Sequence, residues 1–261
     1  MDKSLVQKRT NKILEKVDKP GEFKKELQVL LKSLVDEKAT KNYKRIIPDT
    51  GKFYGVPKSI LWIIALEIGK FIQKEPTKAK RLLKVIWSEE SYEAKQIAGK
   101  SLEKFGQKNP TICLDFISSA LPDLDNWSVC DSLAMYGVRK IVYSNPKLVL
   151  PLSEKWIRND DKWARRFGIV TLLGYNRIKT NRKVFELLGL VMKGEDKDVR
   201  KAVSWILREI TKKNPEAVFK FLMKWTKTNP NKDTRWIIKN GLKKLKESHR
   251  KEIEEILNKV C

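Results

Sequence analysis

The sequence has 261 residues, and charge is its most unusual property. It holds 56 Lys and Arg against 32 Asp and Glu, a net charge of +24 at pH 7. A compact chain with this much like charge repels itself unless a polyanion neutralises it. Nucleic acid is therefore the favoured partner, because phosphate contacts release counterions. The alternative is a Lys-rich, thermophilic proteome, in which Lys and Glu rise together, but here the acids do not keep pace.

The inventory of reactive residues excludes several classes of site. His249 is the single histidine, which argues against Ser-His triads and His-ligated metals. The three cysteines fit no zinc spacing, and their odd number favours a reducing compartment. No phosphate-binding glycine loop or signal peptide is found, and the apolar run near Ile60 is too short to span a bilayer. We expect no metal, cofactor or membrane contact, and a cytoplasmic, nucleoid-associated protein.

Helical periodicity recurs along the whole chain, without a convincing alternating strand. The segment from Asp36 to Gly55 is the least regular, and Pro48, Asp49, Thr50 and Gly51 indicate a loop there. Proline is well suited to a first helical turn because its missing N–H has no partner there. Such signals predict helix starts near Ser4, Gly21, Pro57, Pro76, Ser91, Pro110, Asn126, Pro146, Asp160, Asn181, Lys197, Pro215, Asn231 and Ser248.

Some of these starts repeat at a fixed interval of 34 to 36 residues: Pro76, Pro110, Pro146, Thr180-Asn181 and Pro215. In three of them Asn precedes the proline, and a second helix fits between successive starts. A period near 35 residues built from helical pairs is typical of α-solenoids. Because the Gly-Tyr and Ala pattern of TPR units is missing, we predict an all-α, HEAT-like array. We expect one domain over residues 1–261, curved, with a basic concave surface and monomeric.

The stretch from Asp123 to Asp131 predicts a site on a helix. Asp125 or Asn126 can cap the helix, which places Trp127 and Asp131 one turn apart on the same face. At about 100° per residue, both side chains project away from the apolar stripe. That stripe consists of Val129, Cys130, Leu133, Ala134, Gly137 and Ile141. An aromatic ring and an acid offered together off the packing face indicate a functional site.

Trp205, in a helix expected from Asp196 to Lys213, is a second candidate. It is predicted to lie opposite the core stripe, on a polar side with Lys201, Ser204 and Arg208. Stacking on a base or sugar and packing against the next helix are both open explanations. Further basic residues of these repeats could follow a DNA backbone: Lys193, Lys197, Arg200, Lys212, Lys213, Arg235, Lys239, Lys243 and Lys244.

Arg165 and Arg166 open a helix whose remaining residues are nearly all apolar. Two arginines in such a place need a carboxylate or an outside anion as partner. A guanidinium matches phosphate oxygens in a bidentate manner, which favours DNA. A structural ion pair with Asp131 or Glu209 is the alternative.

These motifs together resemble AlkD-type DNA alkylation-repair glycosylases, which have HEAT-like repeats. The resemblance rests on W-x-x-x-D at Trp127 and Asp131, W-x-R-R ending at Arg166, and A-x-x-W-x-L-R-E around Trp205. The early family segment corresponds to Phe53-Tyr54-Gly55-Val56-Pro57, with a shortened gap. The resemblance implies Trp127 and Trp205 as site tryptophans, Asp131 as the catalytic carboxylate, Arg166 on the DNA backbone and Tyr43 as a further site aromatic.

The resemblance also implies excision of cationic N3- and N7-alkylated purines from duplex DNA, as in base excision repair. We thus expect Asp131, Trp127 and Trp205 in catalysis, and Arg166, Arg165, Tyr43, Lys201 and Arg208 in DNA binding. A non-catalytic HEAT-like protein that binds distorted or branched DNA is the second interpretation. A protein–protein scaffold is the third, and it leaves the charge and the Trp127–Asp131 pair unexplained.

Overall fold

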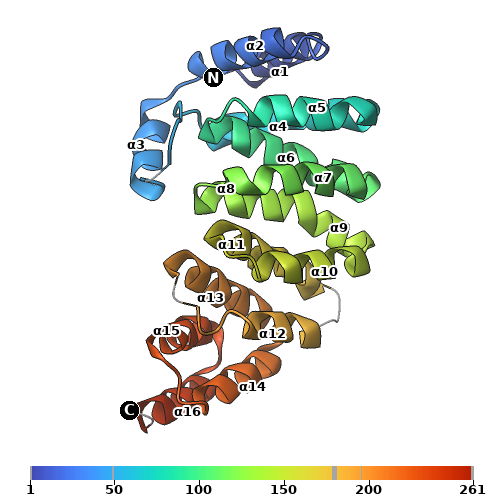
Figure 1. Ribbon diagram of the computed structural model, residues 1–261. Helices are drawn as coiled ribbons and strands as arrows, with labels where there is room; N and C mark the ends of the chain where they lie inside the picture. The colour runs from blue at the N-terminus through green and yellow to red at the C-terminus, as the bar shows by residue number, and fades with distance from the viewer. Residues whose placement is uncertain (1, 49, 178–180, 195, 260–261) are drawn as a thin grey trace. The chain divides into compact units, whose positions relative to one another are not determined.

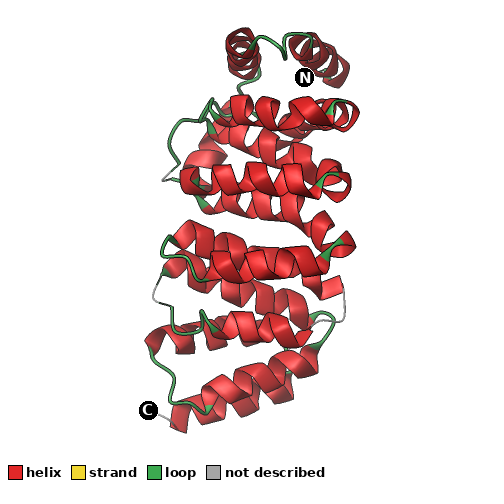
Figure 2. Cartoon of the chain, turned by 45° about the vertical axis from the view of Figure 1, so that its right-hand side comes forward, coloured by secondary structure: helices red, strands yellow, loops and turns green. Residues whose placement is uncertain are grey.

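Proline and short polar caps fix where the helices begin, as the sequence predicts. The computed structural model describes residues 2–48, 50–177, 181–194 and 196–259, in which helices occur and no strand does (Figure 2). Pro76, Pro110, Pro146 and Pro215 each begin a helix. The residue before each of them has φ between −121° and −141° and ψ between 59° and 68°. Proline disfavours helical backbone at that preceding residue, so each such residue makes a sharp corner between helices.

The residues group into two compact units, 1–144 and 145–261. In the first unit (Figure 1), α1 pairs with α2, α4 with α5 and α6 with α7. Its elements are α1 (Lys3–Leu14), α2 (Pro20–Lys32), α3 (Glu37–Ile46), α4 (Lys58–Lys74), α5 (Pro76–Trp87), α6 (Tyr92–Lys108), α7 (Pro110–Ala120), η1 (Leu121–Asp123), α8 (Trp127–Ser132), η2 (Leu133–Val138) and α9 (Arg139–Ser144). Helix α3 stands outside these pairs (Figure 1).

The second unit repeats the helical pair more regularly. Helix α10 packs on α11, α13 on α14, and the helices α11, α13 and α15 follow one another in contact. Its elements are α10 (Pro146–Ile157), α11 (Lys162–Thr171), η3 (Leu172–Arg177), α12 (Asn181–Gly189), α13 (Lys197–Thr211), α14 (Pro215–Thr226), α15 (Lys232–Gly241), η4 (Leu242–Lys244) and α16 (Glu247–Lys259). Thr180, one of the predicted starts, lies outside the described residues, and α12 begins at Asn181.

The repeat period of the sequence reappears as hydrogen bonds between neighbouring repeats. In the first unit, Ser101 donates to the carbonyl of Ala65, 36 residues earlier, and Trp87 Nε1 donates to Asp123, 36 residues later. In the second, Asn176 donates to the carbonyl of Glu209, 33 residues later. The all-α, HEAT-like prediction is confirmed. One domain over 1–261, its curvature and its basic concave face stay predictions.

Two elements differ from the expected helices. The least regular segment contains a real helix, α3, which begins at the cap Asp36, while Asp49 lies outside the described residues. The helix that starts at Trp127 contains a π-helical turn, η2, from Leu133 to Val138. Gly137 in this turn allows close packing, because an added Cβ would lie 2.9 Å from Ile117. No helix among the described residues is long and apolar enough to cross a membrane.

Candidate functional site

Of the two predicted caps, Asn126 is the one that begins the helix with Trp127 and Asp131. Its Oδ1 accepts a hydrogen bond from the Val129 backbone N–H at 3.0 Å, which satisfies an open donor of the first turn. Asp125 instead accepts from Lys95 Nζ at 3.2 Å and from the Asn126 side chain. Helix α8 then starts at Trp127, so Trp127 and Asp131 lie one turn apart as predicted.

The same helix separates buried from accessible residues as the periodicity predicts. The whole predicted stripe is buried, whereas Trp127 is 38% exposed and Asp131 is half-buried. Single exposed apolar side chains are common on folded proteins, so the exposure of Trp127 gains its meaning from the carboxylate one turn away. The described structure therefore leaves an indole accessible beside a carboxylate.

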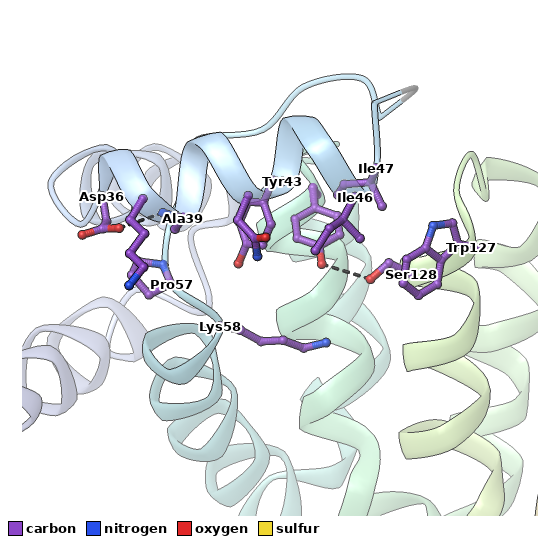
Figure 3. Close-up of a pocket in the computed structure, with 12 residues that line it drawn as sticks. Asp36, Ala39, Tyr43, Ile46, Ile47, Pro57, Lys58, Trp127 and Ser128 are labelled. Atoms are coloured by element: carbon purple, nitrogen blue, oxygen red, sulfur yellow. Dashed lines mark hydrogen bonds between the residues drawn. The ribbon is translucent and has the colours of Figure 1, made fainter.

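A pocket of about 610 Å³ opens between α3, the start of α4 and α8 (Figure 3). Trp127 and Ser128 form one wall, and α3 supplies Tyr43 and Ile46 to the other, with Ile47 directly after the helix. The exposed Ile46, at 41%, and Trp127 leave apolar surface at this pocket. Only the family resemblance predicts Tyr43 as a site aromatic, and the structure places it in the same pocket as Trp127.

Tyr43 is held firmly rather than left free to move. Its ring packs against Tyr92 at a centroid distance of 4.9 Å, and its hydroxyl donates to the Val56 carbonyl at 2.8 Å. The Tyr92 hydroxyl in turn lies 3.0 Å from Ser128 Oγ on α8 (Figure 3). Burial raises the pKa of both tyrosines, so neither acts as a ready proton donor near neutral pH.

Two buried glutamates hold the segment that connects α3 to α4. The Glu93 carboxylate accepts hydrogen bonds from the backbone N–H groups of Tyr54, Gly55 and Val56, at 3.0, 2.7 and 3.2 Å. Burial raises the pKa of Glu93 despite these bonds. Glu89 accepts from Lys52 and from the Tyr54 hydroxyl. The segment that resembles the early family motif thus positions the wall of the pocket.

Gly55 has a conformation that other residues rarely adopt. Its φ is +96°, and an added Cβ would lie 1.9 Å from Thr40 Oγ1 on α3. The glycine therefore serves both the turn and the close approach of α3. Glycine at this place in the motif follows from backbone geometry.

Lys58 is a pocket residue that the sequence did not reveal. It is the first residue of α4, and its Nζ lies 5.0 Å from the centre of the Trp62 ring. Burial lowers the pKa of Lys58, the Asp131 charge opposes this shift, and Lys100 adds to it. Lys100 itself lies 4.0 Å from the centre of the Tyr136 ring. One lysine among many carries no signal in the sequence, so only the fold singles it out.

The remaining predicted residues lie in the second unit, on the packed helices α11 and α13. Trp205 is half-buried and Lys201 is exposed, as expected for the polar side of α13. Ser204 was predicted on that side, which is wrong. It is 1% exposed, and its hydroxyl donates to the carbonyls of Arg200 and Ile237. A serine can satisfy its hydroxyl inside a repeat contact, which the periodicity alone does not reveal.

The arginines use a kind of partner that the sequence analysis did not consider. Arg166 is 5% exposed and donates from Nη1 to the Asp198 carbonyl at 2.7 Å. Arg208 donates in the same way to the Asn240 carbonyl at 3.0 Å, and Arg165 lies 3.5 Å from the Asn159 carbonyl. Arg166 and Arg208 each reach 32 residues along the chain. Arg166 and Arg208 thus bind backbone carbonyls of a neighbouring repeat, and Arg165 binds one in the turn before its own helix. The sequence predicts only acids or phosphates as their partners.

Among the residues that the structure describes, no group of three or more His, Cys, Asp or Glu could hold a metal ion. In the first unit, the reactive groups at or near the pocket include Asp131, the aromatic rings and Lys58. A carboxylate there can stabilise a positive charge, and an aromatic face can attract one.

Comparison with known proteins shows which solved structures have a similar fold and which family the chain belongs to. AlkD2 from Streptococcus mutans is 19% identical, with a TM-score of 0.60 over 80% of this chain and 98% of that chain. The smu.31 protein from Streptococcus mutans UA159 is 20% identical, with a TM-score of 0.55 over 71% of this chain and 100% of that one. These likenesses concern the fold. No curated protein matches the sequence. The family model described as "DNA alkylation repair enzyme" matches residues 27–245, and the chain belongs to that family.

Proposed function

We propose that this protein is a DNA glycosylase that hydrolyses the N-glycosidic bond of cationic N3- and N7-alkylated purines in duplex DNA. The observation that carries the proposal is the accessible Trp127 beside Asp131, on a chain of a DNA alkylation repair family. The net charge of +24 supports duplex DNA as the partner.

The chemistry suits a carboxylate without a protonated general acid. An N3- or N7-alkylpurine already carries a positive charge, so it can leave as a neutral base. The sugar that remains has oxocarbenium character, and the Asp131 carboxylate stabilises it and orients the attacking water. Half-burial of Asp131 strengthens its electrostatic effect compared with a carboxylate in bulk water.

The aromatic residues add attraction for the positive charge. Trp127 and Trp205 would each contribute about 0.5 to 2 kcal/mol through the cation–π effect. Tyr43 takes part through its ring, because its hydroxyl is already bound to the Val56 carbonyl. The Tyr43–Tyr92 pair is buried except for a small part of its surface, and it would form a rigid backing for the nucleotide.

DNA binding in this proposal involves basic residues of the second unit. Lys201 is exposed and can reach a phosphate directly. Arg165, Arg166 and Arg208 each donate to a backbone carbonyl, and in this proposal their positive charges attract the DNA phosphates. These hydrogen bonds to carbonyl oxygens would orient each guanidinium group before DNA binds.

The test is release of N7-methylguanine or N3-methyladenine from duplex DNA, with wild type beside Asp131→Asn. We expect Asp131→Asn to bind DNA normally and to release base about 100-fold more slowly, since it loses the stabilising charge. Asp115→Asn is the matched control, because Asp115 is exposed on α7 and pairs only at the surface with Lys80.

The outcomes separate the other interpretations. Unchanged release from Asp131→Asn would remove the carboxylate from the mechanism. Binding without release by the wild type would favour a non-catalytic DNA-binding protein. Neither binding nor release would leave a protein–protein scaffold. Binding that weakens by orders of magnitude between about 50 and 200 mM salt would mark several phosphate contacts.

A further inference from the structure

Lys58 combines an accessible amine with a place beside the proposed catalytic carboxylate. It lines the same pocket as Trp127, and its side chain extends from the start of α4 toward the helix that carries Trp127 (Figure 3). Its charge interacts with Asp131, and the Trp62 ring lies 5.0 Å from Nζ. The residue as a whole is exposed, so a reactant can reach the amine.

The surroundings lower the pKa of this amine, although the Trp62 ring favours its charged form. Loss of hydration around Nζ is the largest effect, and it lowers the pKa of Lys58. The positive charge of Lys100 lowers it further, while Asp131 opposes the shift. Lys58 also stands at the first position of α4, where the helix dipole disfavours a cation. Burial and a neighbouring cation are the two usual ways in which a lysine becomes a nucleophile.

The product of the proposed function carries the group that such an amine attacks. Base release leaves an abasic deoxyribose whose ring opens to an aldehyde at C1′. This step of the argument rests on the proposed function, which sets C1′ beside Asp131. Lys58 shares a pocket with Trp127, one turn before Asp131 on α8, so we place its amine on the side from which the new aldehyde can be reached.

We propose that Lys58 forms a Schiff base with the C1′ aldehyde of an abasic site and gives the protein an abasic-site lyase activity. The Nζ lone pair adds to C1′, and a proton moves from nitrogen to the former carbonyl oxygen. Water then leaves, so that amine and aldehyde become an imine and one water molecule. The imine takes up a proton and withdraws electrons from C2′.

Strand cleavage follows by elimination. A base removes a C2′ proton, and we assign this role to Asp131, the carboxylate that the proposed function sets beside C1′. The electron pair forms a double bond between C2′ and C3′, and the 3′ C–O bond breaks. The leaving oxygen departs as the 5′-phosphate of the downstream fragment. Hydrolysis of the imine then returns the free Lys58 amine, with no outside oxidant or reductant consumed.

The test uses duplex DNA in which the abasic site is already present, made by removing uracil beforehand. The full-length protein is mixed with this DNA and sodium borohydride, which reduces an imine to a stable covalent cross-link. We compare wild type, Lys58→Arg and Lys74→Arg. Lys74 is the matched control, because it is exposed on the same helix and lies outside the pocket.

We expect wild type and Lys74→Arg to cross-link and to nick the DNA, and Lys58→Arg to lose both by about tenfold or more. Arginine keeps the positive charge, so a role in phosphate binding alone would survive the Lys58→Arg change. Peptide mass spectrometry of the cross-linked wild type should locate the deoxyribose remnant on Lys58.

Absence of a wild-type cross-link would overturn the proposal, as would equal cross-linking by Lys58→Arg or attachment at another lysine. Because the abasic site is supplied ready-made, the assay does not depend on base release. A Lys58 cross-link without release of methylated bases would therefore reject the glycosylase and keep the lyase. Base release without a cross-link would do the reverse.

Discussion

Different polar side chains hold the backbone in two parts of the molecule: buried and half-buried arginines in the second unit, and two buried glutamates near the pocket of the first. In the second unit, arginines donate to backbone carbonyls of the following elements, as Arg166 does to Asp198, Arg208 to Asn240 and Arg235 to Leu257. In the first unit, the buried carboxylates of Glu89 and Glu93 accept from an irregular segment between α3 and α4. Arginines thus stabilise the regular helical repeat of the second unit, whereas two glutamates hold the segment of the first unit that departs from the repeat.

This difference marks the first unit as the part of the molecule in which the fold departs from its helical repeat. The first unit contains α3 outside the helical pairs, Gly55 at a φ of +96° and the π-helical turn η2. Backbone of this kind costs stability and persists where the surroundings determine it strongly. Helix α3 lines the pocket that holds Tyr43, Lys58 and Trp127, the Gly55 turn leads into the start of α4 at that pocket, and η2 continues the helix that carries Trp127. Departures from regularity tend to coincide with functional sites, and π-helical turns are frequent there.

The largest effect on this comparison is expected from Gly55→Ala. The new Cβ would require Thr40, and with it α3, to shift away from position 55, and φ of +96° strains any side chain. Strain and overpacking together should lower the free energy of unfolding by about 3 kcal/mol. Urea unfolding measures the loss, and the base-release assay should fall with it because α3 forms a pocket wall.

Gly51→Ala is the control for this change. Gly51 lies in the same connecting segment, and an added Cβ would meet nothing within 4 Å. It should leave both unfolding and base release unchanged. If the two variants behaved alike, the position of α3 would not depend on the Gly55 turn.

A smaller effect is expected from Glu89→Gln. Although burial raises the pKa of Glu89, hydrogen bonds from Lys52, Ser91 and Tyr54 outweigh it, and the net shift is downward. Removing the charge should cost about 2 kcal/mol of unfolding free energy at pH 7. A lowered folded-state pKa contributes stability above the unfolded value, near 4.5, and that stability is lost as pH falls through the folded value.

The difference between wild type and Glu89→Gln should therefore shrink as the pH falls below about 4.5. Urea titrations at pH 7 and at successive acidic pH values measure it. Glu90→Gln is the control, because Glu90 is the exposed neighbour. A difference that stays constant with pH would show that the Glu89 charge does not contribute.

Much of the regular structure follows from the sequence because it depends on local chemistry. Proline and Asn caps fix helix starts, so α7 begins at Pro110 and α8 at Trp127, as predicted. The spacing of Trp127 and Asp131 along one turn then determines that both avoid the buried stripe. The period near 35 residues is read directly from the prolines.

The rest depends on contacts between distant residues. Helix α3 has no equivalent in the repeat, and the segment that follows it is held by Glu93, 37 to 39 residues away. Lys58 differs from other lysines only through its neighbours Asp131 and Lys100. Ser204 and Arg208 carry ordinary polar side chains, and their partners Ile237 and Asn240 lie on the next repeat. No local pattern encodes such partners.

The smallest effects separate the two kinds of basic residue in the second unit. Arg208→Lys keeps the charge but loses the fork that reaches the Asn240 carbonyl, so the free energy of unfolding should fall by about 1 kcal/mol. Lys201→Ala, on the same helix, removes an exposed charge and should leave unfolding unchanged. Its effect should appear in DNA binding, where the slope of log K against log salt should decrease by about 1.

Urea unfolding and salt-dependent DNA binding of both variants together decide whether Arg208 stabilises the fold while Lys201 binds DNA. Arg208→Lys should keep the wild-type salt slope, because the number of positive charges is the same. An unchanged slope for Lys201→Ala would remove that residue from the DNA contact. Wild-type stability of Arg208→Lys would show that the carbonyl bond does not stabilise the repeat, and the contrast between a cation-stabilised array and an anion-stabilised pocket would then rest on the first unit alone.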